Sequence, residues 1–171
     1  MSQLPVVTAS PLPVNSALRL AHPRAGYVDA YRVKCSGVDS AEAAGRQLFG
    51  SSPAWVGALM RLRDTLVRPF GLRTYPADKA VLPSAALLPN AIVGPFRVYS
   101  VSQQEVVLGQ NDRHLDFRVS VLVEGTEVVV STAVWFHNWF GTLYFALVRL
   151  FHHLVVPALL RHSFRTSSPS A

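Results

Sequence analysis

Four strand-like segments follow one another between residues 96 and 137, and this run constrains the fold more than any other feature of the sequence. They cover 96–101, 104–110, 114–124 and 126–137. The breaks between them, "SQQ", "NDR" and "EGT", are short enough for hairpins. Strands joined by hairpins pair antiparallel with their neighbours, so the sequence predicts an antiparallel meander.

The segment 114–124 has two faces of opposite character. Its apolar side chains occupy every second position and are Leu115, Phe117, Val119, Val121 and Val123; between them stand His114, Asp116, Arg118 and Ser120. This period of two is typical of a strand with one face on the core. The polar face has two interpretations: a solvated surface, or a row of working groups beside a pocket.

The segments before the meander complete an α+β pattern. Residues 28–35, "VDAYRVKC", alternate as a first strand. Asp39 and Glu42 form a capping box for a short helix, and Pro53 opens a second short helix. The prediction is an antiparallel sheet of about five strands, two short helices after the first strand, and a long helix at the C-terminal end.

That last helix, over residues 139–160, is long enough to span a membrane. Arg149 near its centre costs about 2.5–3.5 kcal/mol in a bilayer and opposes insertion. Its pattern is amphipathic: one face carries Phe140, Leu143, Leu147, Leu150, Phe151 and Leu154, and the other Thr142, Arg149, His153 and Arg161. We therefore expect a core helix that lies across the sheet on its leucine face and no transmembrane segment, with weak contact to a membrane surface as the alternative.

Length and charge limit the domain organisation and the partners. A chain of 171 residues suits one domain, which we place at 15–164 between a flexible arm (1–14) and a flexible tail (165–171). The net charge is +6 and no Asp or Glu follows Glu127, a balance that favours anionic partners in general. The motifs of nucleic-acid binding are missing, so we expect no nucleic-acid partner.

Other classes of chemistry lack their sequence signatures. Cys35 is the only cysteine, which excludes an intrachain disulfide and a cysteine-built metal site. A Gly-x-Ser-x-Gly elbow for nucleophilic catalysis is absent, and so are Gly-rich phosphate loops. We expect neither a cofactor nor a metal ion. The first residues lack the pattern of a secretory signal, which predicts a cytoplasmic protein.

His114, Asp116 and Arg118 remain the most plausible polar cluster. A surface ion pair between Asp116 and Arg118, joined by a neighbour such as Glu105, is one interpretation. In the other, the Arg118 guanidinium at a cavity rim holds an anionic ligand that Asp116 orients.

Four stretches resemble a bacterial family known as domain of unknown function 2867. They are "DAYRV", "SSPAWVGALMRLRDTLVRPFGLRT", "VVLGQNDRHLDFRVSVLV" and "HNWFGTLYFALVRLFHHLVVPALL". The most specific parts are "HLDFR" at 114–118 and the spacing of Asn138, Gly141, Tyr144 and His152. The resemblance implies a START-like, helix-grip (SRPBCC-type) fold, in which a curved antiparallel sheet wraps one long C-terminal helix. It implies no catalytic residues, although some family members are fused to an NAD-binding domain.

Three functions follow from this pattern. The first is a non-catalytic domain that binds a small apolar or amphipathic molecule between the sheet and the last helix, covered by the apolar loop 81–93. Its candidate ligand-binding residues are Phe117, Val119, Val121, Leu143, Tyr144, Leu147, Phe151 and His152. The second is a module that interacts with a protein or a membrane surface, beside an NAD-dependent oxidoreductase for example. The third is an enzyme that uses His114, Asp116 and Arg118. The oligomeric state is not predicted.

Overall fold

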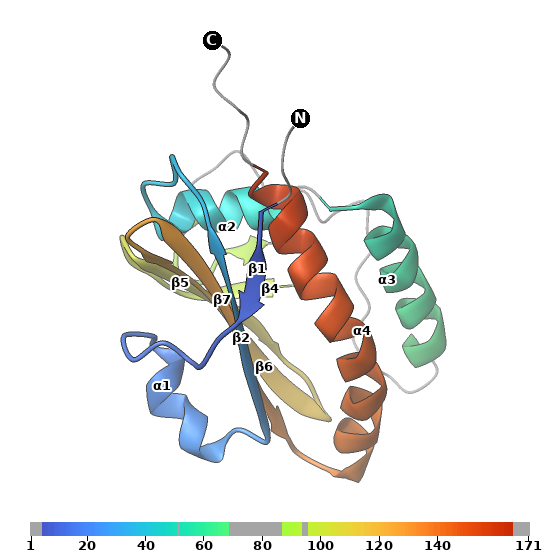
Figure 1. Ribbon diagram of the computed structural model, residues 1–171. Coiled ribbons are helices and arrows are strands. Elements are labelled where there is room, and N and C mark those ends of the chain that lie inside the picture. The colour runs from blue at the N-terminus through green and yellow to red at the C-terminus, as the bar shows by residue number, and fades with distance from the viewer. Residues whose placement is uncertain (1–4, 51, 69–86, 94–95, 166–171) are drawn as a thin grey trace.

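The computed structural model describes residues 5–50, 52–68, 87–93 and 96–165 (Figure 1). The chain order of its elements is β1 (Val7–Ala9), α1 (Leu18–Ala21), a 3-10 turn (His22–Arg24), β2 (Tyr27–Lys34), α2 (Ala41–Gly50), α3 (Ala54–Val67), β3 (Ile92–Val93), β4 (Phe96–Val101), β5 (Glu105–Asn111), β6 (Leu115–Glu124), β7 (Glu127–Phe136) and α4 (Trp139–Ser163). The fold is α+β: a curved, open antiparallel sheet with a long C-terminal helix across it, as the sequence predicts (Figure 1).

The sheet has seven strands in the order β1-β2-β7-β6-β5-β4-β3, and each neighbouring pair is antiparallel. The four-strand meander β4 to β7 and the first long strand β2 were predicted. The expected count of about five is wrong because the edges carry two short additional strands, β1 and β3. The first lies in the segment expected to be a flexible arm, where Val7 to Ala9 pair with β2.

The core lies between the sheet and the helices α2 and α4. Its fully buried residues include Val33, Val98, Leu108, Val121 and Leu160. The odd-numbered side chains of β6 belong to this face, so the apolar face predicted for 114–124 is the core face. The loop predicted to cover one end lies partly outside the described residues; of the rest, Leu87 and Val93 are buried in the core.

The N-cap of helix α2 lies one residue later than predicted, and the helix begins at Ala41. The Ser40 hydroxyl accepts a hydrogen bond from the Ala43 backbone, and Ser40 rather than Asp39 is the N-cap. Glu42 does not close a capping box either: its carboxylate accepts from the Leu87 backbone and from Arg46. This carboxylate therefore ties α2 to the segment before β3.

The face that α4 turns to the sheet is opposite to the predicted one. Leu143, Leu147, Leu150, Phe151 and Leu154 are exposed, whereas Gly141, Tyr144, Phe145, Val148, His152, Val156 and Leu160 face inward. Three contacts explain the orientation. Gly141 lies so close to the His114 carbonyl that a Cβ would be 2.1 Å from its oxygen. Tyr144 and His152 hydrogen-bond to groups on α3 and β2, which their inward positions allow.

A buried carboxylate on the opposite face of the sheet binds the chain segment that precedes α1. Glu105 on β5 is 9% exposed and accepts hydrogen bonds from the Ser16 and Ser120 hydroxyls and from the Ala17 backbone. It therefore holds the segment before α1 against the sheet. The expected cross-strand link from Glu105 to Asp116 and Arg118 is wrong, because the carboxylate is engaged by these other donors.

Candidate functional site

A cavity of about 290 Å³ lies between the sheet, α4, α3 and α2. Ligand pockets in proteins span roughly 300–1,000 Å³, so this one suits a small molecule. Most of its wall is apolar and comes from Leu48, Phe49, Met60, Phe96, Leu115, Phe117, Val119, Val130, Val134, Phe145, Val148, Val156 and Leu159. The polar side chains are fewer: Arg63, Gln110, Asp112, Thr132, Tyr144 and His152.

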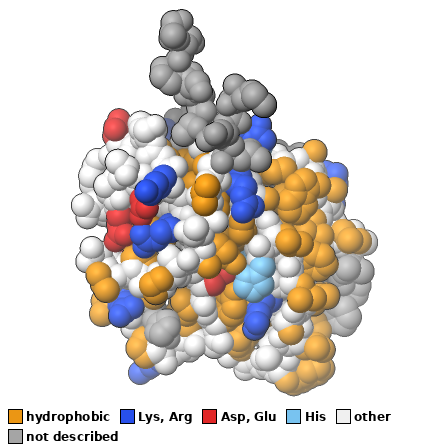
Figure 2. All heavy atoms as spheres, viewed as in Figure 1, with side chains coloured by type: hydrophobic (Ala, Val, Ile, Leu, Met, Phe, Trp, Pro, Cys, Tyr) orange, Lys and Arg blue, Asp and Glu red, His pale blue; other side chains and the backbone are white. Residues whose placement is uncertain are grey.

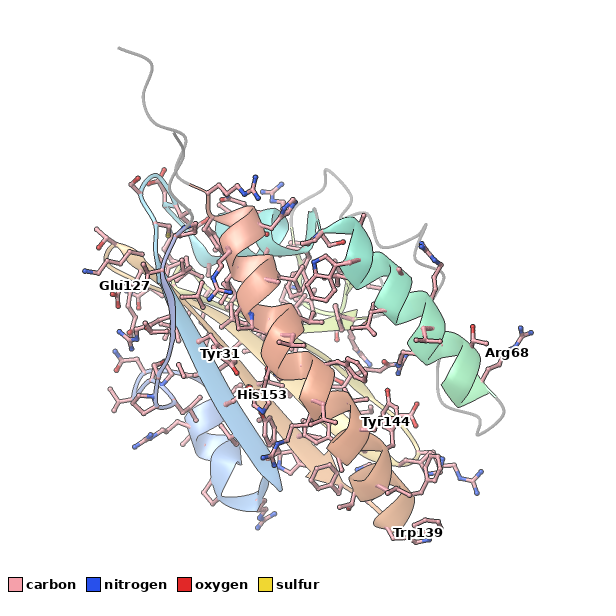
Figure 3. All side chains as sticks on the ribbon, turned by 45° about the vertical axis from the view of Figure 1, so that its right-hand side comes forward. Tyr31, Arg68, Glu127, Trp139, Tyr144 and His153 are labelled. Carbon is pink, nitrogen blue, oxygen red and sulfur yellow. The ribbon has the colours of Figure 1, made fainter. Side chains whose placement is uncertain are left out.

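One polar group of the wall is a contact between α3 and α4. The Arg63 Nε donates to the Tyr144 hydroxyl at 2.8 Å, and Arg63 Nη1 also pairs with Asp64 at 2.6 Å. Burial raises the pKa of Tyr144 above its usual value, although Arg63 acts in the opposite direction. Tyr144 is therefore a neutral phenol whose oxygen accepts from Arg63 and whose hydrogen can still be donated. Figure 3 labels this residue on α4.

A second polar group joins α4 to β2. His152 Nε2 lies 3.1 Å from one carboxylate oxygen of Asp29, and the Tyr27 hydroxyl donates to the same oxygen at 2.8 Å. Both side chains of the pair are largely buried, at 16% and 14% exposure. Burial and the neighbouring Asp29 carboxylate raise the pKa of Tyr27, which keeps it protonated as a donor. A neutral imidazole that donates Nε2–H to Asp29 presents Nδ1 as an acceptor.

The next residue of α4, His153, makes a separate contact with β2. Its Nδ1 lies 2.8 Å from the Tyr31 hydroxyl, and Figure 3 shows the two side chains next to each other between α4 and β2. Arg149 lies over the Tyr27 ring, with its guanidinium carbon 5.6 Å from the centroid. These contacts fix the rotation of α4 about its own axis and hence the shape of the cavity.

Four of the eight candidate ligand-binding residues line the cavity: Phe117, Val119, Tyr144 and His152. Val121 is fully buried in the core beside it. Leu143, Leu147 and Phe151 point away from the cavity and are 61%, 53% and 39% exposed. Their expected orientation is wrong because α4 is rotated relative to the prediction.

The predicted polar cluster is not assembled into one site. The His114 ring contacts Asn138 and Phe140 at the start of α4. Asp116 lies 3.3 Å from His137 Nε2, and the Arg118 guanidinium stacks on the Tyr99 ring, 3.7 Å from its centroid. Asp116 and Arg118 also lie on the sheet face that is turned away from the cavity, so these three residues do not act on a common atom.

Sequence reasoning missed Arg63, Asp29 and the inward residues Phe145 and Val148. Arg63 stood in a run of basic residues with no signal to separate it from Arg61 or Arg68. The inward face of α4 did have a signal: the spacing of Gly141, Tyr144, Val148 and His152 follows one helical face. Within the described ranges, no group of three or more His, Cys, Asp or Glu side chains could hold a metal ion.

Comparison with known proteins assigns the chain to a family. The model of the family described as "Protein of unknown function (DUF2867)" matches residues 21–159, most of the sequence. The chain belongs to this family. No curated protein and no solved structure matches it significantly, so the START-like affiliation stays a prediction.

The residues that are most specific to the DUF2867 resemblance lie at the contacts between α4 and the rest of the fold. Asn138 caps α4 by accepting from the Gly141 backbone at 3.0 Å, and Gly141 permits the close approach to His114. Tyr144 and His152 supply the two polar contacts of the cavity wall. These four residues are thus the ones that fix the position of α4 against the sheet and α3.

Proposed function

We propose that this protein binds a small amphipathic molecule in the cavity between the sheet and α4 without converting it. The observation that carries the proposal is the composition of the cavity wall, which is mainly apolar with polar groups at two places. Ligand sites generally combine a hydrophobic lining with a few polar groups that fix orientation. Because His114, Asp116 and Arg118 have separate partners, this proposal assigns them no chemistry.

The positions of the polar groups suggest the class of ligand. Tyr144 and His152 are eight residues apart on α4, which corresponds to about 12 Å along the helix axis. The Tyr144 hydroxyl offers a donor, and a neutral His152 that donates Nε2–H to Asp29 offers Nδ1 as an acceptor. A ligand that fits has an apolar body, an acceptor group such as a carboxylate or carbonyl at one end, and a donor such as a hydroxyl at the other.

Native mass spectrometry of the purified protein tests this proposal. We expect a bound small molecule that is released on denaturation and that is absent from Val148→Trp, whose added ring would fill the cavity. A wild-type protein that carries nothing and takes up no apolar compound from a mixed small-molecule library would contradict the proposal.

The proposed polar contact has its own matched pair of variants. Tyr144→Phe removes the hydroxyl from the cavity wall, whereas Tyr99→Phe removes a hydroxyl that binds Asn111 on another part of the sheet. For the ligand identified by mass spectrometry, we expect Tyr144→Phe to weaken binding about tenfold, the effect of losing one hydrogen bond of roughly 1.5 kcal/mol. Equal affinities for the two variants would contradict the orientation proposed for the ligand.

A further inference from the structure

The outer face of α4 is an apolar stripe. It consists of Trp139, Leu143, Leu147, Leu150, Phe151 and Leu154, whose exposed fractions range from 39% to 76%. These residues recur every three or four positions and so form one continuous band, and Figure 2 shows hydrophobic side chains gathered over α4. Soluble monomers rarely expose an apolar band of this kind without a partner.

The charged side chains of α4 itself are all basic. No Asp or Glu follows Glu127, so α4 carries no acidic side chain. Arg161 is exposed two turns beyond Leu154, at the C-terminal end of the stripe, whereas Arg149 and His153 lie on the side of α4 that faces β2. Basic side chains beside the hydrophobic side chains also appear in Figure 2. A helix with Trp, Phe and Leu on one face and basic residues at its border is typical of binding in the plane of an anionic lipid surface.

A spanning orientation fits the structure poorly, although α4 is the one helix in the described part of the chain that is long and apolar enough to cross a bilayer. Helix α4 is bound to α3 through Tyr144 and to β2 through His152 and His153. Spanning would break these hydrogen bonds and expose the apolar face of the sheet. An orientation parallel to the membrane leaves all of them intact.

A second copy of the chain is a poorer match for the stripe than a lipid surface. In a two-fold pairing the stripe would cross its own copy near its midpoint, close to Leu147. Such a pairing would offer the exposed Arg161 no acidic partner, because α4 of the second copy carries no acidic side chain, whereas an anionic lipid surface offers phosphate groups.

We propose that the outer face of α4 docks onto the surface of an anionic membrane, with its leucine and aromatic side chains in the headgroup boundary and Arg161 on lipid phosphates. The proposal rests on the stripe and its charges and is independent of any ligand in the cavity.

Sedimentation with lipid vesicles tests this surface. The full-length protein is mixed at low salt with vesicles of phosphatidylcholine alone or with an added fraction of phosphatidylglycerol. We expect the protein to sediment with the anionic vesicles and to stay largely in the supernatant with the neutral ones. Higher salt should release it, because salt screens the attraction between the basic side chains and the lipid phosphates.

Two matched triple variants separate the stripe from general surface hydrophobicity. Leu143→Gln/Leu147→Gln/Leu150→Gln changes the stripe, and Val14→Gln/Leu20→Gln/Ile92→Gln changes three other exposed apolar residues outside α4. We expect the first variant to lose vesicle binding and the second to retain it. Arg161→Gln should weaken binding about fivefold, the effect of roughly 1 kcal/mol per basic residue at an anionic surface. If circular dichroism shows that the stripe variant does not fold, this single variant still tests the proposed contact with lipid phosphates.

Four results would overturn the proposal. They are a wild-type protein that ignores both vesicle types, equal binding to neutral and anionic vesicles, equal loss in the two triple variants, and a wild-type dimer that the stripe variant converts to a monomer. The last result would assign the stripe to a second copy of the chain. Val148→Trp, which fills the cavity, should sediment as the wild type does, so failure of the ligand proposal would not be mistaken for failure of this one.

Discussion

Ser120 and Ser131 lie opposite each other on β6 and β7, and both are fully buried. Their hydroxyl groups have different surroundings. Ser120 donates to the buried Glu105 carboxylate, whereas the Ser131 hydroxyl is, among the described residues, the one buried side-chain polar atom without a hydrogen-bond partner. A buried hydroxyl without a hydrogen-bond partner destabilises the folded state, whereas a buried hydroxyl that donates to a carboxylate stabilises it.

The two serines therefore predict opposite effects of the same substitution. Ser131→Ala should raise the free energy of unfolding by about 1 kcal/mol, and Ser120→Ala should lower it by about 1–3 kcal/mol. Urea denaturation followed by circular dichroism measures both values. A destabilised Ser131→Ala, similar to Ser120→Ala, would show that the Ser131 hydroxyl has a partner such as a buried water.

Two glycines inside helices make a second matched pair. Gly141 in α4 touches the His114 carbonyl, whereas a Cβ on Gly57 in α3 would meet nothing closer than the end of Arg61 at 4.0 Å. Gly57→Ala should stabilise the fold by about 0.5–1 kcal/mol because alanine favours a helix. Gly141→Ala should instead destabilise the fold by several kcal/mol, because the new methyl group would clash with the His114 backbone carbonyl and push α4 away from it. Thermal denaturation of both variants checks this, and equal stabilisation would mean that the close approach at Gly141 does not exist.

The elements differ in how far the sequence predicts them. The alternation along β6 identifies the core face correctly, because its apolar and polar positions contrast strongly. In α4 the contrast is weak: Phe145, Val148 and Val156 are as apolar as Leu143, Leu147 and Leu150. Hydrophobicity alone therefore cannot choose the face, and the choice depends on Gly141 and on hydrogen bonds to distant elements.

Two carboxylates on different strands test which face of the sheet is buried against α4. Asp116 on β6 pairs with the exposed His137, whereas Asp29 on β2 pairs with the buried His152 and accepts from Tyr27. Asp116→Asn should change the free energy of unfolding by well under about 1 kcal/mol, as for other exposed pairs. Asp29→Asn should cost about 1–3 kcal/mol, because hydrogen bonds to a buried charged group are lost. Denaturant midpoints measure the difference, and a larger loss for Asp116→Asn would reverse the assignment of the faces.

On the scale of the whole molecule, the antiparallel meander and the long final helix are predictable from local pattern and the order of segments. The cavity is not, because its wall combines α2, α3, α4 and four strands, and its volume depends on how closely they approach. Arg63 illustrates this limit. Its partner Tyr144 is 81 residues away in sequence, and no local pattern reports a contact over that separation.

The central claim is that the cavity between α4 and the sheet binds a molecule with an apolar body. Two neighbouring residues of α4 provide its most direct test. Val148 lines the cavity, whereas Leu147 is 53% exposed on the outer face. The measurement is a titration of an apolar fluorescent probe into the wild type, Val148→Trp and Leu147→Trp. We predict saturable binding to the wild type and to Leu147→Trp and no saturable binding to a folded Val148→Trp. Loss of binding in Leu147→Trp with full binding in Val148→Trp, or no binding to the wild type, would contradict the claim.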